Sequence, residues 1–179
     1  PSWLKDKGLS IHGSNLCTEI FLPTSKDRTA VCCLSSVNLE YYDEWRGNEQ
    51  FIDDAMEFLD NVLQYFIEHA PDGIRRARYS AMRERSVGLG AMGFHAYLQK
   101  RGIAFESAAA KFTNRDMFRH IAAAVEKADA RLCAERGPCP DAADSGVMRR
   151  FSHRMAVAPN ASSSLIMGGT SPSIEPYRA

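Results

Sequence analysis

Residues 29–39, TAVCCLSSVNL, and residues 51–70, FIDDAMEFLDNVLQYFIEHA, indicate the fold class. In the second stretch, apolar residues recur every three or four positions with acidic residues between them, which predicts an amphipathic helix. The first contains a short apolar run with β-branched residues, bounded by polar residues, which indicates a strand. Short strands separated by long helices favour an α/β arrangement whose strands are buried beneath helices.

The same kind of pattern continues on both sides of this pair. We expect further helices over about residues 91–99 and about 107–135, and strands or strand-to-loop junctions over residues 10–22 and 155–158. The sequence Pro71-Asp72-Gly73 should end the 51–70 helix, because proline cannot continue its hydrogen-bond ladder. The chain has 179 residues and no internal repeat, so we expect residues 1–179 to form one domain.

The charge balance and the apolar runs exclude several classes of protein. Twenty-two basic residues match twenty-two acidic ones, so no overall charge attracts nucleic acid or anionic lipid. The apolar runs are far shorter than the roughly 20 residues that a membrane-spanning helix needs. The first residues also lack the apolar core of a secretory signal. We therefore expect a cytoplasmic protein with no nucleic-acid or membrane partner.

The cysteines do not match a disulfide scaffold, a thioredoxin-type motif or a zinc module. They are odd in number and show no C-x-x-C spacing, and the five histidines are scattered without metal-ligand spacing to them. We expect no metal site. The cysteines must be judged one by one: Cys17, Cys32, Cys33, Cys133 and Cys139.

The segment Ser14-Asn15-Leu16-Cys17-Thr18-Glu19-Ile20 places three polar side chains at alternate positions. In an extended segment, the amide of Asn15, the thiol of Cys17 and the carboxylate of Glu19 would share one face and point into one site. The alternative is an edge strand with solvated polar residues and a buried cysteine. Spacing alone leaves both interpretations open.

The adjacent pair Cys32 and Cys33 lies in the predicted strand of residues 29–39. A strand period sends the two thiols to opposite faces, and so short a ring resists a disulfide between them. One thiol can then face a site while the other faces the core. The alternative is that both are packed as small apolar groups.

A third segment, Ala158-Pro159-Asn160-Ala161-Ser162-Ser163-Ser164, is rich in small polar residues. Small residues let backbone N–H groups approach an anion, and serine hydroxyls add donors, so the loop could hold a diphosphate. It lacks the lysine of a P-loop, and a serine-rich loop can also be a simple turn.

Taken together and in this order, these segments resemble the large, catalytic alpha subunits of class I ribonucleotide reductases. The resemblance rests on the conjunction of five motifs: NLCTEI at 15–20, VCCLS at 31–35, RSVGLG at 85–90, APNASS at 158–163 and SIEP at 173–176. It implies the second half of a ten-stranded α/β barrel, with a central finger loop. The regulatory N-terminal region and the C-terminal tail of those subunits are expected to be absent.

The resemblance also implies roles for the polar residues. Cys17 would carry a thiyl radical that abstracts the 3′ hydrogen of the ribose, Glu19 would be the base on the 3′ hydroxyl, and Asn15 would hold the substrate. Cys32 would be one of the two thiols that supply reducing equivalents, and its partner lies outside this chain. The substrate-binding set is expected to be Asn15, Leu16, Cys17, Thr18, Glu19, Pro159, Asn160, Ala161, Ser162 and Ser163.

Partners follow from the same resemblance. The substrate would be a ribonucleoside diphosphate, the chain would bind no cofactor, and a separate metal-radical subunit would supply the radical. Electrons would come from thioredoxin or glutaredoxin. A fragment should be inactive without the remainder of the large subunit. Two alternatives are a cobalamin-dependent reductase of the same family and a non-catalytic nucleotide-binding part of a split subunit.

Overall fold

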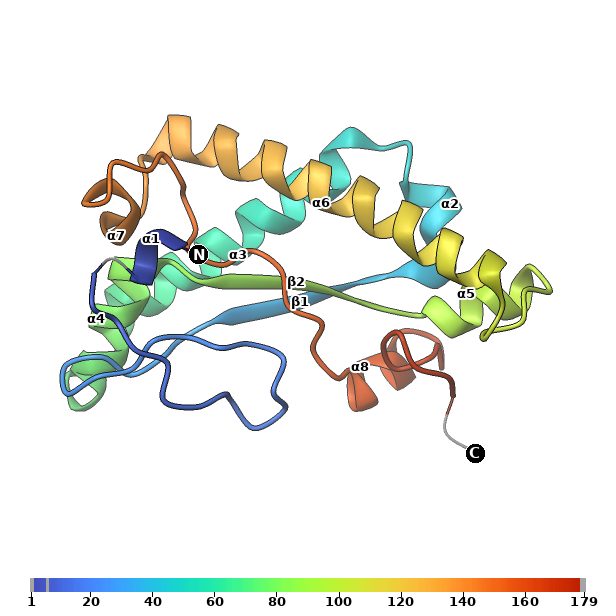
Figure 1. The fold of residues 1–179 in the computed structure, drawn as a ribbon, viewed down its shortest axis with the longest axis horizontal. Helices are drawn as coiled ribbons and strands as arrows, with labels where there is room; N and C mark the ends of the chain where they lie inside the picture. Colours follow the sequence, from blue (N-terminus) through green and yellow to red (C-terminus); the bar gives the residue numbers. More distant parts are fainter. Residues whose placement is uncertain (1, 6, 178–179) are drawn as a thin grey trace.

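The computed structural model describes residues 2–5 and 7–177. Long helices and one small parallel sheet make up most of it (Figure 1). In chain order the elements are α1 Ser2–Lys5, β1 Cys33–Asn38, η1 Leu39–Tyr41, α2 Tyr42–Trp45, α3 Glu49–His69, η2 Asp72–Ile74, α4 Arg75–Glu84, β2 Val87–Met92, α5 Phe94–Lys100, α6 Ala108–Arg136, α7 Pro140–Ala143 and α8 Ala161–Ile166.

Strands β1 and β2 are parallel, in a register that pairs Cys33 with Val87. On the other edge of β2 the segment around Met155 runs parallel to it and forms a bridge with Leu89. This approach depends on glycine, because a Cβ built on Gly90 would lie 2.3 Å from the carbonyl oxygen of Ala156. The three segments therefore form a small parallel layer, in agreement with the predicted α/β arrangement.

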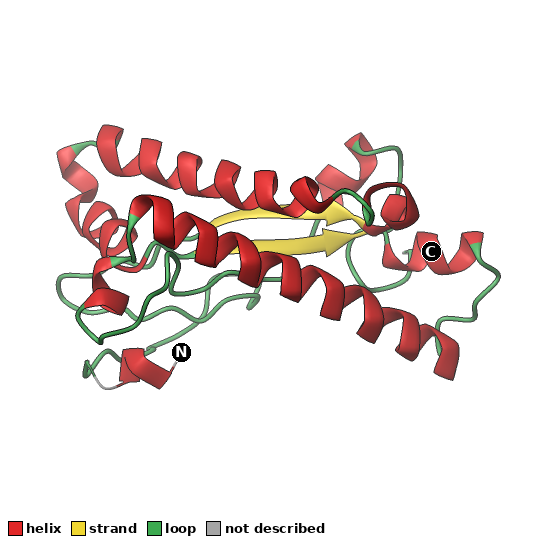
Figure 2. Cartoon of the chain, turned by 90° about the horizontal axis from the view of Figure 1, so that it is seen from above, coloured by secondary structure: helices red, strands yellow, loops and turns green. Residues whose placement is uncertain are grey.

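Helices α3 and α6 pack against each other and cover one face of this layer (Figures 1 and 2). Their inward side chains are almost completely buried and form most of the core with β1 and β2. The segment of residues 7–32 and helix α8 lie on the opposite side of the sheet from α6 (Figure 1). The main core includes Met56, Leu59, Leu63, Ile121, Val125 and Leu132.

The two long helices agree with the sequence pattern to within two residues at each end. The side chain of Asn48 accepts a hydrogen bond from the Gln50 N–H at the start of α3, and Ser107 caps α6 through the Ala110 N–H. Both are typical N-cap contacts, which satisfy N–H groups that have no partner inside the helix.

Three expectations need correction. Residues 10–22 form no strand; a turn at residues 16–17 is followed by a bend at residues 18–19. The helix expected from residue 91 begins at Phe94, because residues 87–92 are β2 and Gly93 turns the chain with φ 81°. Helix α4, which the sequence pattern did not predict, occupies residues 75–84.

A buried ion cluster connects the helices to the sheet. Asp60 of α3 is 1% exposed and accepts hydrogen bonds from Arg85 (2.6 Å), Arg136 (2.9 Å) and Arg150 (3.0 Å). Burial opposes ionisation of this carboxyl, but the hydrogen bond from Arg150 and the charge of Arg85 outweigh it and lower the pKa of Asp60. A buried carboxylate with three cationic partners holds distant segments together.

None of the helices in the described part of the chain is both long enough and apolar enough to cross a membrane.

Candidate active site

The loop of residues 10–24 is closed at its base and turned at its tip, like a finger. At the base the Thr24 N–H donates to the Ser10 carbonyl (3.1 Å), and the Thr24 hydroxyl lies 3.0 Å from the His12 ring. At the tip the Thr18 N–H donates to the Asn15 carbonyl (3.2 Å), and Thr18 has a φ of 61°. This finger loop carries Cys17 at its tip, where the thiol is exposed.

The expectation that three polar side chains share one face of an extended segment is wrong. The turn at residues 15–18 breaks the alternation, so Cys17 is exposed while Glu19 is half-buried. The side-chain oxygen of Asn15 accepts a weak bond from the Ile20 N–H at 3.5 Å, which ties one side of the turn to the other. Asn15 and Glu19 therefore flank the turn that presents Cys17.

A cavity of about 660 Å³ separates the finger loop from the segment that leads into β1. Its volume lies within the range of small-molecule sites. Asn15 lines it from the loop and Cys32 from the facing segment, so the structure brings these two predicted residues to one cavity. The full lining is Gly13, Ser14, Asn15, Ile20, Leu22, Thr24, Thr29, Ala30, Val31, Cys32, Leu34 and Phe66.

The two adjacent thiols face opposite sides, as the strand period predicts. Cys32 packs against a small cluster of Ile20, Leu22 and Ala156 on the side of the finger loop. Cys33 packs against the main core beneath the helices. Cys32 is therefore the thiol that faces the candidate site.

Burial raises the pKa of the Cys32 thiol to about 12, and the nearby charge of Glu19 acts in the same direction. The Ser86 hydroxyl opposes this shift. At neutral pH Cys32 is therefore a protonated thiol. One oxygen of Glu19, Oε2, is buried and has no hydrogen-bond partner among the described residues.

The loop of residues 159–163 leads into α8 on the same side of the sheet as the finger loop (Figure 1). Asn160 is buried, and its amide donates to the carbonyls of Ala158 (2.7 Å) and Ala91 (3.5 Å), which fixes the loop to the end of β2. Ala161, Ser162 and Ser163 are exposed at the start of the helix. This loop does not line the cavity beside Cys32.

Sequence reasoning missed one buried group near Cys32. Glu84 at the end of α4 is 2% exposed, accepts a hydrogen bond from Arg28 (3.2 Å), and contributes to the raised pKa of Cys32. Burial raises the pKa of Glu84 itself to about 7. No sequence signal marks it, because a glutamate within Arg-Glu-Arg looks like part of a solvated surface.

The other cysteines and the histidines form no metal centre in residues 2–5 and 7–177, where no group of three or more potential ligands is placed to hold a metal ion. Cys133 and Cys139 are buried.

Comparison with known proteins places the chain in a family. The sequence model of one protein family, described as the ribonucleotide reductase barrel domain, matches residues 2–149. The chain is 53% identical over 179 residues (100% of the chain) to a ribonucleoside-diphosphate reductase large subunit of Invertebrate iridescent virus 3, and 54% identical over 176 residues (97% of the chain) to a putative one of Frog virus 3.

A solved structure shows the same likeness. The alpha subunit of the class Id ribonucleotide reductase of Actinobacillus ureae matches the whole chain with a TM-score of 0.94 and 42% identity. The chain spans 28% and 30% of the two viral relatives and 34% of this structure. This chain belongs to the family of ribonucleotide reductase large subunits and forms part of their barrel domain.

Proposed function

We propose that this chain is the part of a ribonucleoside-diphosphate reductase large subunit that carries the radical cysteine. The observation that supports this most directly is the finger loop, which presents Cys17 at a turn flanked by Asn15 and Glu19 and faces Cys32 across a cavity. Family membership supplies the reaction: reduction of a ribonucleotide to a deoxyribonucleotide for DNA synthesis.

Each side chain has one task in this proposal. Cys17, as a thiyl radical, takes the 3′ hydrogen of the ribose, and Glu19 accepts the proton of the 3′ hydroxyl. The unpartnered Oε2 of Glu19 supports this role, because no donor among the described residues of this chain competes with the substrate for it. Asn15 positions the substrate on the cavity side of the turn, beside the backbone of Leu16 and Thr18.

The reduction itself needs two thiols. The 2′ hydroxyl leaves as water, and Cys32 together with a second thiol outside this chain gives up two electrons and two protons and becomes a disulfide. The raised pKa of Cys32 fits this step, because a protonated thiol keeps the hydrogen that must be delivered. Cys33 faces the core and is not proposed as the second thiol.

The substrate diphosphate is proposed to lie at Pro159, Asn160, Ala161, Ser162 and Ser163. The N–H groups at the start of a helix have no partner within it and can donate to phosphate oxygens. The exposure of Ala161, Ser162 and Ser163 leaves them accessible to a ligand, and the buried amide of Asn160 keeps the loop in place.

The partners are also proposals. Because the relatives are large subunits about three times as long, we infer that the remainder of such a subunit completes the site. A separate metal-radical subunit would supply the radical, thioredoxin or glutaredoxin would reduce the disulfide, and the setting would be cytoplasmic. This chain would bind no cofactor itself and would be inactive alone.

The test is Cys17→Ser in the large subunit that contains this chain, with Cys33→Ser as the matched control. We expect Cys17→Ser to abolish reduction of a ribonucleoside diphosphate while leaving nucleotide binding intact, and Cys33→Ser to keep turnover. Unchanged turnover in Cys17→Ser would exclude the radical role. Turnover that required adenosylcobalamin in place of a second subunit would contradict the proposed class, and nucleotide binding without any turnover would favour a non-catalytic part.

A further inference from the structure

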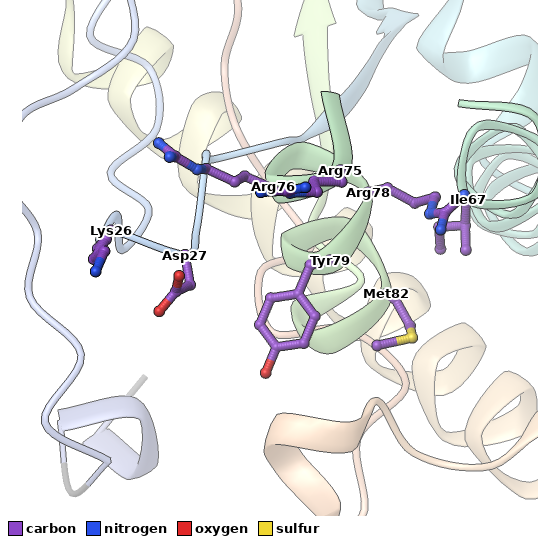
Figure 3. Close-up of a pocket in the computed structure, with 8 residues that line it drawn as sticks. All are labelled: Lys26, Asp27, Ile67, Arg75, Arg76, Arg78, Tyr79 and Met82. Carbon is purple, nitrogen blue, oxygen red and sulfur yellow. The ribbon is translucent and has the colours of Figure 1, made fainter. Parts of the chain in front are cut away.

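A second cavity of about 660 Å³ lies at the start of α4, away from the tip of the finger loop. Figure 3 shows Lys26 and Asp27 on one side of it, Ile67 of α3 on the other, and the side chains of α4 between them. Its lining is Lys26, Asp27, Ile67, Arg75, Arg76, Arg78, Tyr79 and Met82. None of these residues lines the cavity beside Cys32.

The charge of this cavity is strongly positive. Four of its lining residues are basic and one, Asp27, is acidic. Most other arginines of the chain are paired with a carboxylate, for example Arg28 with Asp141 at 2.5 Å. In the part of the chain that the structure describes, no carboxylate lies within ion-pair distance of Lys26 or of the arginines of this cavity. A concentration of unpaired cations therefore stands out in a chain with no net charge.

The position of these arginines on the helix adds to the positive potential. Arg75, Arg76 and Arg78 lie in or next to the first turn of α4, which contains no acidic residue. The start of a helix carries a partial positive charge, which adds to the charge of these arginines and favours an anion there. The geometry thus makes an anion the natural occupant.

The remaining walls indicate what kind of anion fits. Tyr79, Met82 and Ile67 add an aromatic ring and two apolar side chains beside the cations. Guanidinium groups recognise phosphate with paired hydrogen bonds, while the apolar wall can contact a flat organic group. The volume lies in the range of small-molecule sites.

We propose that this cavity binds a polyphosphate, with the chemistry of a nucleoside triphosphate or of inorganic tripolyphosphate, at a site separate from the catalytic one. The proposal rests on the cations and the cavity and does not depend on the radical chemistry of Cys17. It assigns the phosphates to Arg75, Arg76, Arg78 and Lys26.

The test measures binding of inorganic tripolyphosphate and of ATP to the large subunit that contains this chain, by calorimetry at several salt concentrations. The variant is Arg76→Ala/Arg78→Ala, and the control is Lys111→Ala/Arg119→Ala, which removes the same charge from α6. We expect the first pair to weaken binding at least tenfold, and the control pair to leave it within about twofold. Binding should also weaken as salt is raised.

Some outcomes distinguish a nucleotide from an inorganic polyphosphate, and others would overturn the proposal. If the binding that is lost in Arg76→Ala/Arg78→Ala is tight for ATP and weak for tripolyphosphate, the site is assigned to a nucleotide; if the lost binding is similar for both, the site is assigned to the phosphates alone. Millimolar or absent binding of both, or equal weakening by the control pair, would overturn the proposal, as would binding of only an acidic peptide. Binding lost in Ser162→Ala/Ser163→Ala but kept in the arginine variant would place the ligand at the catalytic phosphate loop instead.

If the alanine pair does not fold, a conservative double variant still tests the proposal. Arg76→Lys/Arg78→Lys keeps the charge but loses the paired hydrogen bonds, and should weaken binding less than the alanine pair does. Equal affinity of the lysine pair, the alanine pair and the unchanged protein would overturn the proposal, because it would show that these side chains do not contact the ligand.

Discussion

Replacement of Glu84 by glutamine should raise the free energy of unfolding relative to the unchanged chain, and this gain should be larger at alkaline pH than at acidic pH. Glu84 is 2% exposed, and only one of its oxygens has a partner, the Arg28 guanidinium at 3.2 Å. Burial raises its pKa from 4.5 to about 7. The folded protein therefore binds this proton more tightly than the unfolded chain does. The resulting stability is fully present below pH 4.5 and is lost as the pH rises through 7.

The magnitude follows from the shift. A difference of about 2.5 pKa units corresponds to about 3 kcal/mol, since each unit is about 1.4 kcal/mol. Glutamine does not titrate, so the variant should gain up to about 3 kcal/mol relative to the unchanged chain between pH 5 and pH 8. Arg28 loses one charged partner in the variant but keeps Asp141, which accepts from it at 2.5 and 3.0 Å. The attraction between Arg28 and ionised Glu84 is already contained in the pKa of about 7, so only the difference between glutamine and protonated Glu84 shifts the whole curve without changing its slope.

A second group, the half-buried His153, acts in the same pH window with the opposite sign. Burial lowers the pKa of His153 to about 4, so the folded protein binds this proton less tightly than the unfolded chain does. Its contribution is absent at low pH and grows as the pH rises from 4 to 6.5. The two effects are of similar size, so the stability of the unchanged chain should vary little over this range. Only the difference between variant and unchanged chain isolates Glu84.

The assay is urea unfolding at pH 5, 6, 7 and 8 of the unchanged chain, of Glu84→Gln and of the control Glu106→Gln, whose side chain is exposed. The reasoning predicts a difference between Glu84→Gln and the unchanged chain that grows with pH, and a flat difference for the control. A flat or falling difference for Glu84→Gln would refute it.

Three further predictions test the fold and the site. Gly90→Ala should destabilise the chain by about 3 kcal/mol or more in urea unfolding, because the new Cβ would lie 2.3 Å from the Ala156 carbonyl oxygen; a variant as stable as the unchanged chain would contradict this packing. Asp60→Ala should cost about 3–5 kcal/mol, because it leaves buried arginines without a counter-charge, and a loss below about 1 kcal/mol in the same assay would disprove the role of the cluster. Iodoacetamide at pH 8 should modify Cys17 at least tenfold faster than Cys32, because one thiol is exposed and the other has a pKa of about 12; mass spectrometry showing equal rates would be incompatible with the proposed protection of Cys32.

The sequence pattern predicted the amphipathic helices whose ends are marked by capping or helix-breaking residues. Helix α3 has a buried apolar face and a cap at Asn48, and α6 has a cap at Ser107, so both ends are readable from local chemistry. Strand β2 could not be predicted, because its sequence VGLGAM contains two glycines, which have low strand propensity. The glycines are needed because Leu34 and Ala156 pass close to Gly88 and Ala156 passes close to Gly90, and these contacts are tertiary.

The geometry around the proposed site residues differs from the one that the strand period predicted. Motif resemblance selected Cys17, Glu19 and Cys32, whereas the strand period placed the first two on one face, which the structure contradicts. The turn at the tip holds Thr18 at a φ of 61°, a conformation that a β-branched residue rarely adopts. This backbone has no local sequence signal, and the hydrogen bond that closes the loop joins Ser10 and Thr24, which are distant from Thr18 in the sequence.

The exposure of the finger tip indicates how the rest of a large subunit must fit this chain. Leu16 is 98% exposed, and Cys17 beside it is also exposed. A carbon radical made by a thiyl group would be lost to side reactions in open water, so the proposed chemistry requires that this tip be enclosed. Among the described residues β1 has a neighbouring strand on one edge only, β2, and an unpaired edge is a ready template for another strand. Pairing at that edge by the remainder of the subunit would extend the barrel around the finger loop, so completion of the sheet and enclosure of Cys17 would be one event.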